Sequence, residues 1–220
     1  MDLEHLPPLY AIVDVDVAQS AGYGVAELAE RYLVGGARWL QLRAKAAGSR
    51  ELLAWIDAIQ AHVATKDACL IINDRVDVAL VSGARGVHVG QDDLPVEAVR
   101  RVLRPSAIVG LSTHTPAQVD AAVRLPVSYI AVGPVFATRT KDAAYDAVGC
   151  ELVRYAAERA RPRPVVAIGG ITLERAPEVL AAGATAVAII SDLLVGADPE
   201  ARTRAFVERL PTYRAPDGTV

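Results

Sequence analysis

The chain is poor in cysteine and in aromatic residues, and this scarcity excludes several classes of protein. It has two cysteines, Cys69 and Cys150, and 5% aromatic residues in a length of 220. Two cysteines so far apart have neither the spacing of a zinc site nor the number that a disulfide framework needs. We therefore expect two reduced thiols in a cytoplasmic protein.

Long apolar runs and a strong excess of one charge are also lacking. No apolar stretch reaches the roughly 18 residues that a membrane-spanning helix requires. The start of the chain has no basic segment followed by an apolar one, so we expect no secretory signal. The net charge is −3, which predicts neither nucleic acid nor an anionic membrane as a partner.

What the sequence does have is a regular alternation of apolar runs with helix-period segments. Hydrophobic residues make up 52% of the chain, enough to bury one sizeable core. Most of the runs are continuously apolar, which is typical of parallel strands covered on both faces. The eight expected strands are Leu9–Val13, Trp39–Arg43, Cys69–Asn73, Gly86–Val89, Ile108–Ser112, Tyr129–Val135, Val165–Gly169 and Ala186–Ile190.

The segments between these runs have the spacing of helices. From Val25 to Leu33, apolar residues fall at i, i+3, i+4, i+7 and i+8, which is one helical stripe. Thr115 precedes Pro116 as an expected N-cap. Eight such units predict a (β/α)₈ barrel, the TIM-barrel fold, in a single domain with flexible ends at 1–8 and 215–220. A doubly wound sheet is the alternative.

Seven short clusters of polar residues or glycine stand directly behind strand-like runs. Stability does not require polar groups at one end of every strand, whereas the carboxyl ends of barrel strands are where ligands bind. We therefore predict an active site at one mouth of the barrel. The clusters occupy residues 41–43, 73–75, 88–93, 112–114, 138–141, 169–170 and 191.

Asp74 and Asp93 follow two neighbouring strands and are candidates for a metal site. Carboxylates are hard oxygen ligands, and Mg²⁺ is commonly held by one or two of them together with substrate phosphates. The alternative is structural, because each aspartate could instead cap the helix that follows it.

The basic residues near the same mouth suggest a phosphorylated substrate. Arg43, Lys45 and Lys141, with Gln41 and Asn73, could converge there as hydrogen-bond donors. They could equally form a solvated basic rim.

The ends of the last two strands carry a second phosphate signal. Gly169-Gly170 and Ser191 stand where barrels of this kind usually bind phosphate through backbone N–H groups. By itself, a glycine pair predicts only a turn. His88 and His114 are expected to be packed, hydrogen-bonded residues rather than general bases.

Taken in order, these motifs resemble the thiamine-phosphate synthase family. The resemblance runs from about Leu9 to Leu193 and covers seven motifs, each of them weak alone. They are Gln-Leu-Arg-Ala-Lys at 41–45, Ile-Asn-Asp-Arg at 72–75, Gly-Val-His-Val-Gly-Gln-Asp-Asp at 86–93, Gly-Leu-Ser-Thr-His-Thr at 110–115, Val-Gly-Pro-Val-Phe-Ala-Thr-Arg-Thr-Lys at 132–141, Ala-Ile-Gly-Gly-Ile at 167–171 and Ile-Ile-Ser at 189–191.

The resemblance implies a (β/α)₈ barrel that joins a hydroxymethylpyrimidine diphosphate to a thiazole phosphate and releases pyrophosphate. It assigns Mg²⁺ to Asp74 and Asp93. The pyrimidine diphosphate would be held by Gln41, Leu42, Arg43, Ala44, Lys45, Asn73, Ser112 and Lys141, of which Arg43, Lys45, Ser112 and Lys141 would be catalytic. The thiazole phosphate would be held by Thr138, Arg139, Thr140, Gly170, Ile190 and Ser191.

Two other functions fit parts of the pattern. A thiazole tautomerase has a similar barrel and would use His114, but such relatives typically lose the diphosphate and metal residues that are present here. A non-catalytic barrel that binds thiamine precursors is the second alternative. Ala44 departs from the family, which commonly has an acidic residue there. We expect small-molecule substrates, with homo-oligomers possible.

Overall fold

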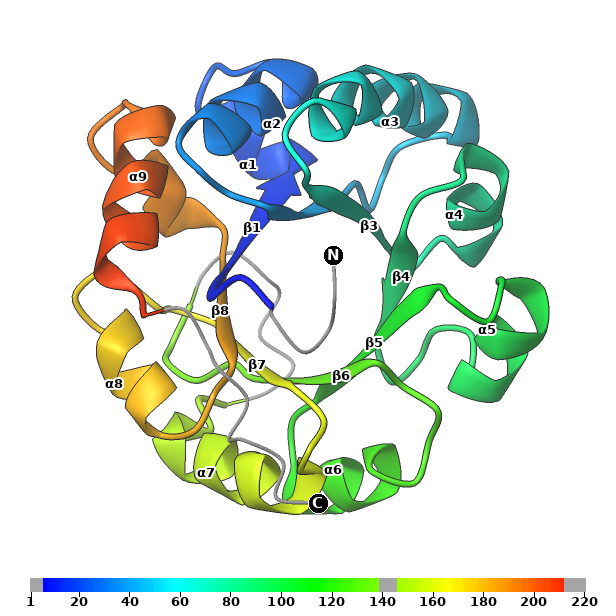
Figure 1. The fold of residues 1–220 in the computed structure, drawn as a ribbon, viewed down its shortest axis with the longest axis vertical. Coiled ribbons are helices and arrows are strands. Elements are labelled where there is room, and N and C mark those ends of the chain that lie inside the picture. Colours follow the sequence, from blue (N-terminus) through cyan, green and yellow to red (C-terminus); the bar gives the residue numbers. More distant parts are fainter. Residues whose placement is uncertain (1–5, 139–145, 212–220) are drawn as a thin grey trace.

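Eight parallel strands close into a barrel in the computed structural model, which describes residues 6–138 and 146–211. The strands pair in sequence order, and β1 closes the ring against β8. Figure 1 shows the ring of strands with the helices arranged around its outside. The strands are β1 (Leu9–Asp14), β2 (Trp39–Arg43), β3 (Cys69–Asn73), β4 (Gly86–Val89), β5 (Ile108–Thr113), β6 (Tyr129–Val132), β7 (Val165–Ile168) and β8 (Ala186–Ile189).

Helices follow every strand of the barrel. The helix predicted from the stripe at Val25 to Leu33 is present as α2, and Thr115 caps α6 by accepting from the Gln118 N–H. The helices are α1 (Val15–Ser20), α2 (Val25–Val34), α3 (Ser49–Ala64), α4 (Val76–Ser82), α5 (Val96–Val102), α6 (Pro116–Ala122), α7 (Gly149–Ala160), α8 (Ala176–Ala181), the 3₁₀ helix η2 (Ser191–Leu194) and α9 (Pro199–Arg209).

The structure confirms the barrel, with strand boundaries within one residue of the prediction except at the end of the sixth strand. The expected sixth strand, Tyr129–Val135, ends at Val132. Pro134 has no N–H to donate to a ladder, so regular pairing cannot pass through it. The Val135 N–H nevertheless reaches the Ile168 carbonyl at 2.8 Å. The loop after β6 is therefore tied to the end of β7.

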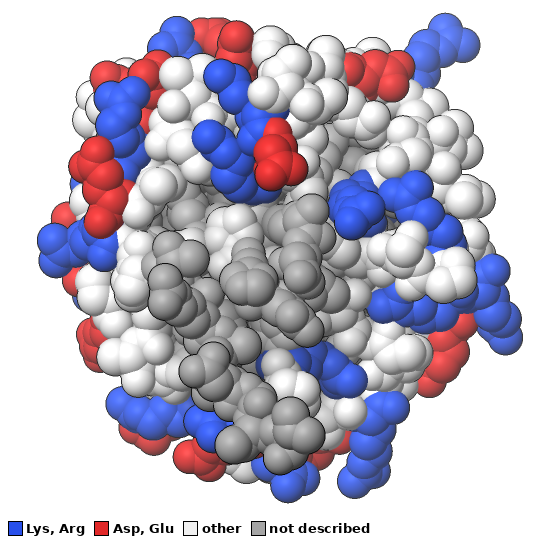
Figure 2. Space-filling view, in the orientation of Figure 1, with Lys and Arg blue, Asp and Glu red and all other residues white. Residues whose placement is uncertain are grey.

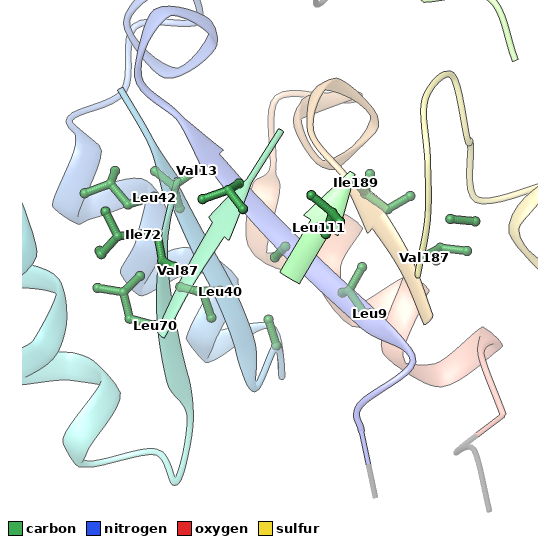
Figure 3. Close-up of a cluster of buried hydrophobic side chains, with 14 of the residues drawn as sticks. Leu9, Val13, Leu40, Leu42, Leu70, Ile72, Val87, Leu111, Val187 and Ile189 are labelled. Carbon is green, nitrogen blue, oxygen red and sulfur yellow. The ribbon is translucent and has the colours of Figure 1, made fainter. Parts of the chain in front are cut away.

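Strand side chains alternate between two separate cores. Outward residues such as Leu40, Leu42 and Val87 pack against the helices, as Figure 3 shows. Inward residues such as Tyr10, Trp39 and Tyr129 fill the barrel interior. The barrel interior is thus a packed core, and it supports any site at the barrel mouth.

Residues 6–8, part of the end that the sequence predicts to be flexible, pack against the barrel. Leu6 is fully buried in the barrel interior, and the Pro8 carbonyl accepts from the Val187 N–H at 2.9 Å. An apolar side chain closes this part of the interior, so these residues belong to the fold. Residues 1–5 and 215–220 lie outside the described residues.

Both cysteines are free thiols, as predicted. Burial raises the pKa of Cys69 to about 12, so this thiol stays protonated at neutral pH. Within the described segments, no helix has both the length and the apolar character needed to cross a membrane.

Candidate active site

Polar side chains converge on one mouth of the barrel because they occupy the inward positions at the carboxyl ends of the strands. Their neighbours in sequence, such as Leu42 and Leu111, face the outer core. Figure 2 shows basic and acidic side chains spread together around the described part of one face. The inward polar residues are Asp14 of β1, Gln41 and Arg43 of β2, Asn73 of β3, His88 of β4 and Ser112 of β5.

Arg43 is held in place by Asp14, the last residue of β1. The two side chains form an ion pair between adjacent strands, and they are 12% and 2% exposed. Asp14 also accepts from the Val17 N–H at 3.2 Å and so caps α1. One buried carboxylate therefore fixes both the guanidinium and the start of a helix.

Lys45, Asp74 and Asp93 form a charged cluster at the same mouth. Lys45 Nζ lies 2.5 Å from Asp74 Oδ2, and the side chains of Asp74 and Asp93 share a hydrogen bond. Asp93 Oδ2 also accepts from the Gly90 N–H at 2.7 Å. Asp74 has a φ of 60°, a left-handed conformation that aspartate adopts more readily than most residues.

The two carboxylates of this cluster have opposite pKa shifts. Burial raises the pKa of Asp74, the ammonium of Lys45 opposes the rise, and the hydrogen bond with Asp93 adds to it. Burial alone would raise the pKa of Asp93, but the hydrogen bonds from Asp74 and from the Gly90 N–H bring it below its usual value. A proton on Asp74 thus relieves the repulsion between two close carboxylates.

Neither aspartate caps the helix after it. The N-cap of α4 is Arg75 and that of α5 is Pro95. Two carboxylates that approach each other closely enough to share a proton offer oxygen ligands to a divalent cation. Within the described residues no three metal-binding side chains come together. A site of two carboxylates could hold Mg²⁺ only with further ligands from phosphates and water.

The end of β7 lies against the loop that follows β6. Gly170 has a φ of 60°, and a Cβ there would lie 2.6 Å from the Ala137 carbonyl oxygen. Both the left-handed conformation and the close backbone contact require glycine at this position. Ser191, after β8, is exposed and begins η2.

The largely buried carboxylate of Asp192 joins the segments that follow β7 and β8. Asp192 Oδ2 accepts from the Leu173 N–H at 3.0 Å and lies 2.6 Å from Arg202 Nη2. Arg202 also stacks over the Phe206 ring. These contacts of Asp192 hold together the two segments that the sequence predicts to bind phosphate.

Some predicted site residues do not present a side chain to the mouth. Leu42 is buried in the outer core and can meet a ligand only through its backbone, whereas Ala44 is half-buried and packs against the same core. Ile190 packs against the barrel interior, and Thr138 is half-buried. Arg139, Thr140 and Lys141 lie outside the described residues.

The site also contains residues that sequence analysis missed. Asp14 lies one residue beyond the expected strand Leu9–Val13, and Tyr10 and Tyr129 lie within expected strands. His88 was expected to be a packed, hydrogen-bonded residue, and it bonds to both Tyr129 and Ser112. His114 Nδ1 is 2.5 Å from the Gly133 carbonyl oxygen, so its ring is likewise tied to the fold.

A closed barrel with carboxylates and basic groups at one mouth defines the class of (β/α)₈-barrel enzymes. The family model described as thiamine monophosphate synthase matches residues 9–193. The chain therefore belongs to this family, as the sequence motifs predicted.

Two curated relatives, both named thiamine-phosphate synthase, match nearly the whole chain. That from Koribacter versatilis is 41% identical over 207 residues, covering 93% of this chain and 96% of its own. The relative from Chlorobium luteolum is 38% identical over 219 residues, and the match covers 100% of this chain and 100% of the relative.

Solved structures give the same result for the fold. A thiamine phosphate pyrophosphorylase from Pyrococcus furiosus superposes with a TM-score of 0.85 at 31% identity, covering 94% of this chain and 97% of its own. A 3-hexulose-6-phosphate synthase, with a TM-score of 0.66 and 18% identity, shares the fold alone.

Proposed function

We propose that this protein is a Mg²⁺-dependent transferase that forms thiamine phosphate. It would join hydroxymethylpyrimidine diphosphate to a thiazole phosphate and release pyrophosphate. The observation that carries the proposal is the Lys45–Asp74–Asp93 cluster, which lies at the same barrel mouth as the Arg43–Asp14 pair in a protein of this family. Membership of the family and relatives of the same printed name support the activity.

The reaction breaks a bond between carbon and a diphosphate oxygen and forms one between that carbon and the thiazole nitrogen. The electron-rich aminopyrimidine stabilises positive charge on the carbon, so the protein has to stabilise the charge that departs with the diphosphate. Arg43 and Lys45, each already held by a carboxylate, are preorganised for this role. Holding the thiazole nitrogen close to the carbon supplies proximity.

Asp74 and Asp93 would hold the metal ion. When bound, Mg²⁺ would neutralise charge on the diphosphate and orient it. Lys45 lies 2.5 Å from Asp74, and its charge lowers the pKa of both aspartates, so it would balance the charge of this cluster when the diphosphate binds. Lys141 would add a second ammonium. The thiazole phosphate would lie near Gly170 and Ser191, next to the segments after β7 and β8 that Asp192 holds together.

An assay with both precursors and each precursor alone tests this proposal. We expect thiamine phosphate only when pyrimidine diphosphate, thiazole phosphate and Mg²⁺ are all present, as judged by chromatography and mass spectrometry. Conversion of a thiazole phosphate in the absence of the pyrimidine would instead identify an isomerase. Binding of both precursors without any product would identify a non-catalytic barrel.

A further inference from the structure

A line of hydrogen bonds crosses the barrel interior from Gln41 to Ser112. Gln41 Nε2 is 2.8 Å from the Tyr10 hydroxyl, which lies 3.2 Å from the Tyr129 hydroxyl. That hydroxyl is 2.9 Å from His88 Nδ1, and His88 Nε2 is 2.8 Å from Ser112 Oγ. Five strands each contribute one member. The line joins two residues that the proposed function assigns to one substrate.

The inner members of this line are buried where apolar side chains usually fill a barrel. Gln41 is 3% exposed, Tyr10 1%, Tyr129 0% and His88 7%. Buried polar groups destabilise a fold unless each finds a partner, so filling space does not explain four of them in a row. Here they are joined end to end, which specifies one arrangement of the interior.

The surrounding residues preserve the space and orientation that the line needs. A Cβ at Gly110 would lie 2.3 Å from the Tyr129 hydroxyl and 2.5 Å from His88 Nδ1. A glycine within a strand often marks such a close approach. On the other side, the Trp39 ring stacks on Tyr10 with centroids 3.9 Å apart and an interplanar angle of 9°.

The hydrogens along the line can run in one direction throughout. Burial raises the pKa of both Tyr10 and Tyr129, so each phenol keeps its single hydrogen. With Gln41 donating, Tyr10 donates to Tyr129, and Tyr129 donates to His88 Nδ1. A neutral His88 then carries its hydrogen on Nε2 and donates it to Ser112.

We propose that Tyr10, Tyr129 and His88 are positioning residues that fix the side chains of Gln41 and Ser112 for the substrate. Ser112 accepts from His88, so its own hydroxyl hydrogen is left for a bound anion. Gln41 is fixed with its amide nitrogen toward Tyr10, so its carbonyl oxygen is left for a ligand that donates. The inference rests on the proposed function for its activity measurements.

Tyr129→Phe removes one hydroxyl from the middle of the line and keeps the ring. We expect kcat to fall about tenfold, with KM for both substrates within about twofold, because Ser112 is still present but no longer fixed. The matched control is Tyr32→Phe, which removes a hydroxyl that is equally buried but lies in the outer core. A kcat for Tyr129→Phe within about twofold of this control overturns the proposal.

A double-mutant cycle separates positioning from general destabilisation. If Tyr129 acts through Ser112, then Tyr129→Phe should lower kcat by less than about twofold when Ser112 is already alanine. Losses that multiply in the double variant overturn the proposal. If circular dichroism shows that Tyr129→Phe does not fold, a second cycle takes its place. It combines Tyr10→Phe, which removes the hydroxyl bonded to Gln41, with Gln41→Ala.

Nitrogen-15 NMR of protein with labelled histidines measures the tautomer of His88 and so tests the line of hydrogen bonds without an activity measurement. The chain has four histidines, and His88→Gln assigns the signals of His88. We expect one neutral tautomer with the hydrogen on Nε2, and a mixture of tautomers in Tyr129→Phe. A mixture in the wild type, or no change in the variant, overturns the proposal.

Failure of the proposed function would be recognised separately. A wild type that makes no thiamine phosphate contradicts the activity but leaves the tautomer measurement valid. In that case affinity for inorganic pyrophosphate replaces kcat in the cycle, because free pyrophosphate carries the negative charge that develops on the departing group and is absent from the intact substrate; calorimetry measures this affinity. Tyr129→Phe should weaken this affinity, and only while Ser112 is present; any other pattern overturns the positioning role.

Discussion

At the level of single residues, a substitution of Asp93 distinguishes a metal site from a pair of carboxylates with a purely structural role. It does not cap α5, and its Oδ2 accepts from the Gly90 N–H at 2.7 Å. Asn keeps that bond through its amide oxygen but removes a charge from the proposed Mg²⁺ site. We expect Asp93→Asn to lower kcat at least about a hundredfold, equivalent to about 2.7 kcal/mol of transition-state stabilisation.

The control for this variant is Asp92→Asn, which makes the same charge change at the exposed neighbouring residue. Its turnover and its dependence on Mg²⁺ should match those of the wild type, and both variants should melt near the wild-type temperature. An Asp93→Asn variant with unchanged activity and unchanged metal dependence would exclude the ligand role.

Asp14 carries a second prediction at this scale. Asp14→Asn keeps a cap for α1 but removes the anion beside Arg43, which is only 12% exposed. Leaving a largely buried charge without its partner typically destabilises by about 3 kcal/mol. We expect a lower melting temperature and a higher KM for the pyrimidine diphosphate, measured by calorimetry and initial rates.

The double variant Asp14→Asn, Arg43→Gln provides the control, because it removes both charges together. Its melting temperature should recover toward that of the wild type while its KM stays high. A double variant less stable than Asp14→Asn would show that the pair does not act as described.

The sequence predicted the charged residues of the site better than it predicted which side chains contact each other. Asp74, Asp93, Arg43 and Lys45 were identified because chemistry-bearing residues directly follow apolar runs. Tyr10 and Tyr129 were not, because they stand 119 residues apart and meet only through strand register and inward orientation. No local pattern carries that information.

At the scale of the element, the contact between β7 and the loop after β6 is tested by Gly170→Ala. The added Cβ would lie 2.6 Å from the Ala137 carbonyl oxygen, at a backbone φ of 60°. The loop must therefore shift. We expect weaker binding of thiazole phosphate and nearly unchanged binding of pyrimidine diphosphate, both measured by calorimetry.

Gly149→Ala is the control for this prediction, since it also has positive φ but has nothing within 4 Å of an added Cβ. It should reproduce the backbone strain without the change in affinity. An equal loss of both ligands in Gly170→Ala would indicate general misfolding, and no loss would remove this contact from the phosphate site.

Elements were predictable where apolar periodicity was long and unbroken. The stripe of α2 and seven of the strand runs gave the right elements, with boundaries shifted by at most one residue. The sixth run failed at its end because Pro134 cannot join a ladder. Helix α1 was missed because its six residues follow β1 without a break, with Asp14 serving as both strand end and cap.

At the scale of the whole molecule, the fold explains why residues from distant parts of the chain can act together. Parallel strands place all their carboxyl ends at one mouth, so Arg43 meets Asp14 and Lys45 meets Asp74, although 29 residues separate the members of each pair. The closed barrel was predictable from the count of eight units, and membership of the family follows from the match over residues 9–193.

Metal-dependent transfer is tested most directly by following thiamine phosphate and pyrophosphate in one reaction as Mg²⁺ is varied. With the wild type we expect equal amounts of the two products, no reaction after chelation, and full recovery when Mg²⁺ is restored. Asp93→Asn should need far more Mg²⁺ or remain inactive, while Asp92→Asn follows the wild type. Product formation that persists after chelation, or pyrophosphate release without thiamine phosphate, would contradict a Mg²⁺-dependent transfer.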